Sequence, residues 1–172
     1  MRKWMIAVVV LLATGFVVLA AWAQTTILAR SGVWEVFEGK TDQDGREVCG
    51  IAAQVGERYF GLKLFGGNKT FSIQLGGRGL PVEKGQKVDM TLRFDANALW
   101  RSAPIGFRFL DGDPGLETKI HRSELEKFFS EFRNSNELRL QFSNLNTVDW
   151  VLPLNGTNAL GRTFQICSGR LP

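Results

Sequence analysis

Apolar and polar side chains alternate along much of this sequence, in short runs separated by polar or glycine-rich turns. The clearest run places Val88, Met90, Leu92 and Phe94 on one side and charged or polar residues on the other. Because side chains point alternately to the two faces of a strand, such a run predicts a strand with one buried face. The same pattern predicts about eight strands, in the regions 33–37, 48–55, 59–65, 71–75, 88–95, 105–110, 138–142 and 147–152.

Two short linkers indicate how some of these strands are connected. The linker Gly66-Gly67-Asn68-Lys69 joins the runs 59–65 and 71–75, which predicts an antiparallel hairpin. The segment Gly76-Gly77-Arg78-Gly79 marks the next turn. It lacks the Lys-Ser/Thr and the following helix of a phosphate-binding loop, and we interpret it as a turn only.

Two segments have helical periodicity instead. In residues 123–133, Ser123 and Glu126 form an S-x-x-E capping box ahead of phenylalanines at helical spacing. In residues 157–168, Thr157 is the predicted N-cap, and Leu160, Phe164 and Cys167 fall on one face. Both segments predict helices that pack an apolar stripe against the strands.

These elements predict one mainly β domain over residues 24–172. Strands with one apolar face must bury it against a second sheet or against helices. We therefore expect an antiparallel β-sandwich or flattened barrel of about eight strands, with two helices, at about 123–133 and 157–168. A domain of this length buries roughly two thirds of the surface of its unfolded chain, which is enough for an ordinary core.

The N-terminus has the pattern of a secretory signal peptide over residues 1–23. Arg2 and Lys3 precede an apolar stretch over residues 5–20, and Ala21-Trp22-Ala23 is an A-x-A cleavage pattern. The alternative is an uncleaved membrane anchor. Because the positive end stays cytoplasmic, both interpretations place the following domain outside the inner membrane, in the periplasm or the medium.

Cys49 and Cys167 are the only cysteines, and they lie near opposite ends of the predicted domain. Export to an oxidising compartment predicts a disulfide between them. A redox-active pair is the alternative, but neither cysteine belongs to a C-x-x-C motif. We therefore interpret the pair as structural.

Composition argues against several classes of function. One histidine and two cysteines are too few for multi-ligand zinc, haem or iron–sulfur sites, and the sequence predicts no cofactor and no metal. The net charge is +4, and removing Arg2 and Lys3 would leave only +2, with basic and acidic residues interspersed. The sequence therefore lacks the concentrated basic footprint of a nucleic-acid-binding protein.

No catalytic residue stands out from the sequence. His121 could act as a general base, but no G-x-S-x-G motif accompanies it, and its place at the start of a helix favours a surface role. Ten Glu and seven Asp leave a hydrolase with paired carboxylates as an alternative. Asp111, Asp113 and Glu117 have the oxygen-ligand density of a calcium loop, although Asp-Gly and Pro-Gly pairs more often form plain surface turns.

Several basic side chains fall on the polar sides of their predicted strands. If those strands are neighbours, a basic stripe runs across the outside of the sheet and could meet an acidic partner. The alternative is a set of solvated charges that suppress aggregation. The candidate partner-binding residues are Lys63, Arg93, Arg108 and Arg139, together with Trp100, while Trp150 is expected in the core.

Several motifs resemble those of small exported bacterial proteins of the invasion-associated locus B type. They are Trp34-Glu35-Val36, the strand that carries Cys49, Leu80-Pro81-Val82 before Gly85, and Trp150-Val151-Leu152-Pro153-Leu154-Asn155-Gly156 followed by Ala159. The closing segment, with its final Phe-x-x-Cys, also resembles alphaproteobacterial periplasmic proteins of unknown function. The chain departs from the first family because it lacks a mid-chain Cys-Gly signature and carries Cys167 in its last helix.

The resemblance implies a β-rich, non-enzymatic envelope protein linked to host-cell invasion, with no catalytic residue. We therefore expect an exported protein that binds a protein or envelope partner. Two alternatives are a small periplasmic hydrolase that acts on an envelope polymer and a periplasmic inhibitor of a secreted enzyme.

Overall fold

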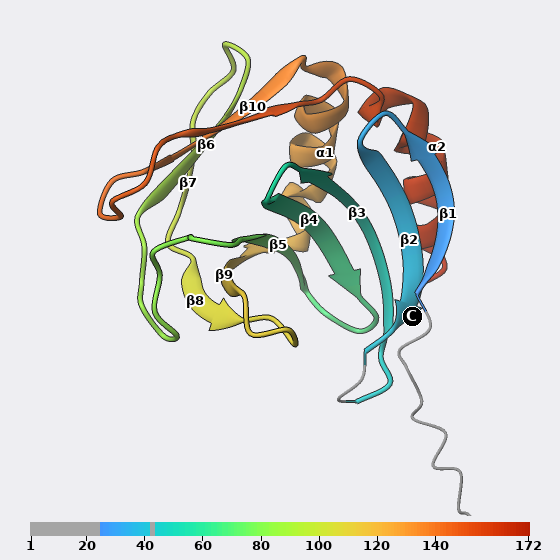
Figure 1. The fold of residues 1–172 in the computed structure, drawn as a ribbon. Coiled ribbons are helices and arrows are strands. Elements are labelled where there is room, and N and C mark those ends of the chain that lie inside the picture. Colours follow the sequence, from blue (N-terminus) through green and yellow to red (C-terminus); the bar gives the residue numbers. More distant parts are fainter. Residues whose placement is uncertain (1–24, 42–43) are drawn as a thin grey trace, which may run out of the picture.

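The computed structural model describes residues 25–41 and 44–172, so the predicted signal peptide lies outside the described residues. Within them the fold is mainly β, with two antiparallel sheets and two α-helices (Figure 1). The larger sheet has the order β1-β2-β3-β4-β5-β9-β8, and the smaller sheet has the order β11-β10-β6-β7. The bounds are β1 Thr26–Ser31, β2 Trp34–Lys40, β3 Glu47–Val55, β4 Arg58–Phe65, β5 Thr70–Gly77, β6 Met90–Phe94, β7 Trp100–Ser102, β8 Ile105–Arg108, β9 Pro114–His121, β10 Glu137–Phe142 and β11 Trp150–Pro153.

This arrangement confirms the β-sandwich and not the flattened barrel, because the two sheets remain separate. The predicted hairpin of β4 and β5 is present, with Leu62 opposite Ile73. Eleven strands replace the predicted eight in the described chain, since β1, β7 and β9 escaped the sequence analysis. The predicted run 88–95 forms a strand only over Met90–Phe94, and the run 147–152 forms one over Trp150–Pro153.

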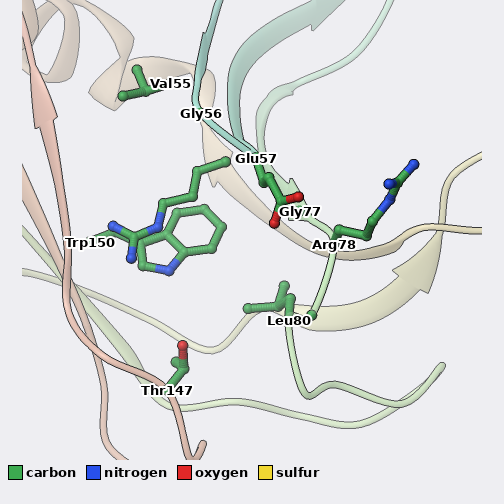
Figure 2. Close-up of a pocket in the computed structure, with 10 residues that line it drawn as sticks. Val55, Gly56, Glu57, Gly77, Arg78, Leu80, Thr147 and Trp150 are labelled. Atoms are coloured by element: carbon green, nitrogen blue, oxygen red, sulfur yellow. The ribbon is translucent and has the colours of Figure 1, made fainter.

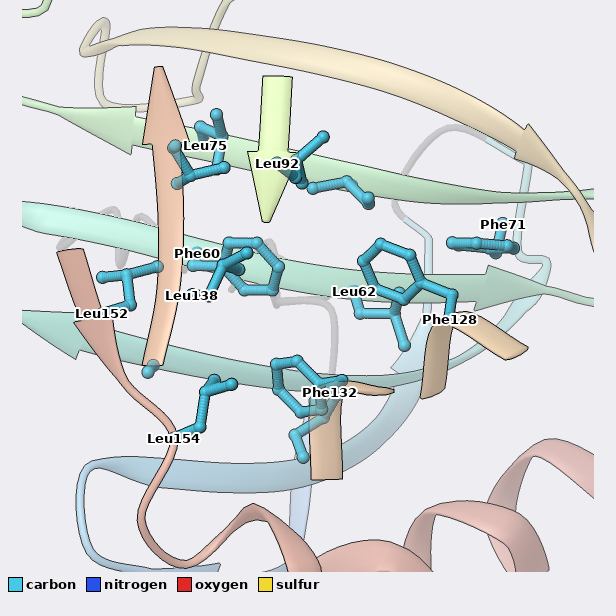
Figure 3. Packing of buried hydrophobic residues seen from close by; sticks show 14 of the residues in the cluster. Phe60, Leu62, Phe71, Leu75, Leu92, Phe128, Phe132, Leu138, Leu152 and Leu154 are labelled. Carbon is cyan, nitrogen blue, oxygen red and sulfur yellow. The ribbon is translucent and has the colours of Figure 1, made fainter. Parts of the chain in front are cut away.

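The core lies between the sheets, and helix α1 (Leu125–Asn134) enters it from one side (Figure 3). Phe60 and Leu62 face inward from the larger sheet, while Leu92 faces inward from the smaller one. Phe132 of α1 is fully buried, and its ring centroid lies 4.9 Å from that of Trp34. The alternation seen in the sequence therefore builds the main core, which both sheets and α1 share.

Helix α2 (Thr157–Gly169) packs beside α1 and against β1, β2 and β3. The ring of Phe164 lies 4.5 Å from that of Phe129 in α1. Cys167 forms the predicted disulfide with Cys49 of β3, with Cα atoms 5.9 Å apart. The predicted apolar face of this helix is confirmed, since Leu160, Phe164 and Cys167 are all buried.

The predicted helix caps differ from those observed. A short 3-10 helix over Arg122–Glu124 precedes α1, and His121 caps it by accepting a hydrogen bond at Nδ1 from the Ser123 backbone N–H. The S-x-x-E box therefore does not cap α1, which has no side-chain cap bond. Thr157 is also not a cap, because it is the first residue of α2 and its hydroxyl donates to the carbonyl oxygen of Leu154.

Gly156 is the N-cap residue of α2, and its close approach to β1 explains why a glycine occupies this position. Its φ is +100°, and a Cβ placed on it would lie 2.7 Å from the carbonyl oxygen of Ser31 in β1. Only glycine can adopt this backbone and allow this approach.

We expect Gly156→Ala to lower the free energy of unfolding by about 2–3 kcal/mol, because backbone strain and a steric clash occur together. Gly45→Ala is the matched control, since Gly45 also has positive φ (+67°) but a Cβ there meets nothing within 4 Å. Urea melts of both variants measure the difference. Equal losses would mean that the contact with Ser31 is unimportant.

Asp95 ties the end of β6 to the start of β10. Its carboxylate accepts hydrogen bonds from the backbone N–H groups of Asn136 and Glu137, and these bonds lower the pKa of Asp95. A carboxyl group whose pKa is lower in the folded state stabilises the fold above its unfolded pKa, and this contribution is lost as the pH falls through the folded pKa.

We therefore expect Asp95→Asn to reduce the loss of stability in acid, as measured by urea melts between pH 6 and about pH 3. Asn tolerates the positive φ of this position (45°) and keeps a side-chain oxygen that can accept hydrogen bonds. An unchanged pH profile would contradict the role given to Asp95.

In the part of the chain that the structure describes, neither helix has the length and apolar character needed to cross a membrane.

Candidate functional site

The structure separates the five predicted partner-binding residues. Arg93 of β6 and Arg139 of β10 stand directly opposite each other in the smaller sheet, and Trp100 lies in the neighbouring strand β7. Lys63 of β4 and Arg108 of β8 belong to the larger sheet. A single basic stripe requires the four strands that carry these residues to be neighbours. Only β6 and β10 are neighbours, so the structure does not form that stripe.

The outer surface of the smaller sheet carries three arginines, which we call the arginine face: Arg93, Arg101 and Arg139. Arg101 of β7 pairs with Thr91, which lies two residues before Arg93 on the same side of β6. Arg93 and Arg101 are exposed and Arg139 is half-buried. Arg101 was missed as a site residue, because only the strand pairing shows that β7 extends this face.

The arginine face holds little compensating negative charge. Arg139 forms an ion pair with Glu137, at 3.3 Å between Nη2 and Oε1. Among the described residues no carboxylate lies within ion-pair distance of Arg93 or Arg101. The cross-strand pair of Arg93 and Arg139 therefore places two like charges side by side on an open sheet surface.

Trp100 faces the interior more than the solvent. Its indole N–H donates a hydrogen bond to Glu131 of α1 at 2.8 Å, and its ring contacts Phe128 with centroids 5.2 Å apart. The ammonium of Lys127 lies 4.9 Å from the ring centroid. Trp100 thus joins β7 to α1, and its half-buried ring is a poor candidate for a docking contact.

Lys63 and Arg108 occupy different surroundings from the arginine face. Lys63 lies on the outer face of the larger sheet, 5.6 Å above the ring of Tyr59 and 6.0 Å from that of Phe37, and burial lowers its pKa. Arg108 is exposed at the end of the edge strand β8, opposite Pro114. Arg108 is therefore an exposed arginine of the larger sheet and does not belong to the arginine face.

The candidate calcium residues do not form one cluster. The Asp111 side chain accepts a hydrogen bond from the backbone N–H of Asp113, which is typical of a turn. Glu117 lies within β9 and accepts from the side chain of Gln74 at 3.2 Å. No group of three or more His, Cys, Asp or Glu residues suited to a metal ion occurs within residues 25–41 and 44–172.

A pocket that no sequence motif indicated lies at one end of the sandwich (Figure 2). It has a volume of about 500 Å³ and is lined by residues 55–58, residues 77–80, Thr147 and Trp150. The turn 76–79, interpreted as a connection only, therefore contributes to a concave surface. Because the three lining segments are far apart in the sequence, no local motif could have indicated the pocket.

The comparisons with known proteins bear on the fold. No protein-family model matches the sequence, and no curated protein matches it. The crystal structure of invasion associated protein B from Bartonella henselae is similar, with a TM-score of 0.54 and 15% sequence identity over 80% of this chain and 95% of that chain. The resemblance found in the sequence is therefore supported in its architecture: the chain folds like invasion associated protein B.

Proposed function

We propose that this chain is an exported, non-enzymatic binding protein whose arginine face binds an acidic surface on a partner protein. The observation that carries the proposal is the cross-strand pair of Arg93 and Arg139. The similar fold of a protein described as invasion associated supports a setting at the bacterial envelope or the host cell.

The energetics of the arginine pair support a role outside folding. Like charges directly opposite each other in a sheet destabilise it, and Glu137 pairs with only one of the two arginines, Arg139. An acidic partner would reverse the sign of this contribution, because each guanidinium can bind a carboxylate through two parallel hydrogen bonds. Val151, which is 40% exposed and pairs with Arg139, adds apolar contact area to the same face.

The disulfide supports the exported setting. Disulfides persist in oxidising compartments and are rare where thiols are kept reduced. The basic and apolar pattern of residues 1–23 fits the same route.

The experiment that tests the proposal is the charge reversal Arg93→Glu. The introduced carboxylate would face Arg139 and form an opposite-charge pair, so we expect thermal stability to be maintained or to rise slightly. Partner capture by crosslinking on intact cells should fall by at least about tenfold, since the partner's carboxylates now meet a negative charge.

Arg108→Glu is the matched control, with the same charge change on an exposed strand residue of the larger sheet. It should leave capture unchanged. Equal loss in both variants would indicate non-specific dependence on net charge, and unchanged capture with Arg93→Glu would contradict the proposed face.

A further inference from the structure

The pocket at the end of the sandwich has the chemistry of an anion site. Arg58 is the first residue of β4 and lies on the same face of that strand as the inward-facing Phe60 and Leu62. Its guanidinium carbon lies 5.3 Å from the ring centroid of Trp150 in the opposite sheet. This pair bridges the two sheets in the lining of the pocket.

The geometry of the pair leaves its hydrogen-bond donors unused. A guanidinium over an aromatic ring uses its face, so its N–H groups in the plane stay available. None of the hydrogen bonds or ion pairs among the described residues involves the side chain of Arg58 or the indole N–H of Trp150, whereas the indole N–H groups of Trp34 and Trp100 both have acceptors. Unpaired donors around one space select a ligand that accepts hydrogen bonds.

The charge balance favours a single negative charge. Arg58 and Arg78 contribute two positive charges to the lining and Glu57 contributes one negative charge. Figure 2 shows Arg78 extending away from Trp150, while Leu80 and Thr147 lie on the side of the indole. Because Arg78 points away from the indole, Arg58 is the cation beside Trp150, and a single guanidinium matches a singly charged carboxylate better than a doubly charged phosphate.

The remaining lining sets the size and polarity of the ligand. Leu80, Val55 and Trp150 supply apolar surface, and the volume of about 500 Å³ suits a small organic molecule. Gly77 allows the two turns to meet closely, because a Cβ there would lie 2.6 Å from the carbonyl oxygen of Glu57. Gly77 therefore lets the segments 55–58 and 77–80 lie close together without a side chain that would fill the pocket.

We infer that this pocket binds a small organic monocarboxylate, with Arg58 and the Trp150 indole N–H as donors to the carboxylate and Leu80 against its apolar body. This site shares no residue with the arginine face, so its test is independent of the proposed function.

The test uses benzoate as the probe and benzamide, its uncharged counterpart, as the control ligand. Benzoate is expected to shift the indole N–H signal of Trp150 in a ¹H–¹⁵N spectrum in a saturable way, and Trp150→Phe identifies that signal. Arg58→Gln should weaken benzoate binding by at least about tenfold, while Arg108→Gln should leave it unchanged.

Arg58→Lys covers the case in which Arg58→Gln does not fold. It keeps a positive charge beside the indole but loses the planar fork, so benzoate should still bind more weakly than to the natural protein. Equal shifts with benzamide, binding that is unchanged in both Arg58 variants, or no saturable shift with benzoate would each overturn the inference. Tighter binding of inorganic phosphate than of benzoate would overturn the assignment to an organic monocarboxylate.

Discussion

Loss of the disulfide is expected to lower the free energy of unfolding by about 5 kcal/mol, in line with the loop entropy of two cysteines that are 118 residues apart. The bridge closes a loop over about two thirds of the chain, and its loss therefore removes a contribution comparable with the stability of an ordinary domain. Cys49→Ser and Cys167→Ser should cost similar amounts, because either change opens the same loop. Urea melts under non-reducing conditions measure both.

The double variant Cys49→Ala/Cys167→Ala is the control for the buried hydroxyl that serine introduces, since both positions are almost fully buried. Reductant should destabilise the natural protein and leave this variant unchanged. Two free thiols in natural protein that has been denatured without reductant would contradict the prediction.

Phe132→Ala should be the most damaging substitution outside the disulfide, with a loss of about 3–5 kcal/mol. The ring of Phe132 lies edge-on to Trp34 and Phe94 and stacks on Phe60, so it joins α1 to both sheets. Removing the ring leaves a cavity where α1 meets the two sheets. Thermal and urea melts should both show the loss.

Ile166→Ala on α2 is the control, because Ile166 is 55% exposed and its truncation removes little buried surface. A loss of similar size for both variants would indicate that the stability of the helices, and not packing between the sheets, determines the result.

Side-chain alternation was enough to predict most of the sandwich. It failed where the local pattern is interrupted. In β1 the register shifts between Ile27 and Ala29, and the strand is half-exposed, which breaks the period of two. Strand β9 begins at Pro114, directly after a turn rich in Asp and Gly, so turn residues concealed its start.

The caps and the candidate site depended on contacts that local sequence does not contain. The S-x-x-E box at Ser123 was a reasonable local signal, but His121 and a 3-10 turn replaced it. Alternation placed Arg93 and Arg139 on the polar faces of their strands. Only the pairing of β6 with β10 placed them opposite each other, and only the meeting of β4 with β11 placed Arg58 on Trp150.

The disulfide between β3 and α2 also constrains the order of folding, because it can form only after both cysteines are present in the same compartment. A chain that crosses a membrane from its N-terminus delivers Cys49 well before Cys167, so an oxidising enzyme first meets a lone thiol. A mixed disulfide that Cys49 forms in that interval, with glutathione or with another chain, is resolved when the Cys167 thiolate attacks the Cys49 sulfur, which forms the native bridge and releases the other thiol. For the exported protein that we propose, the bridge can therefore close only after α2 has been delivered, and until then Cys49 stays open to reaction with other thiols.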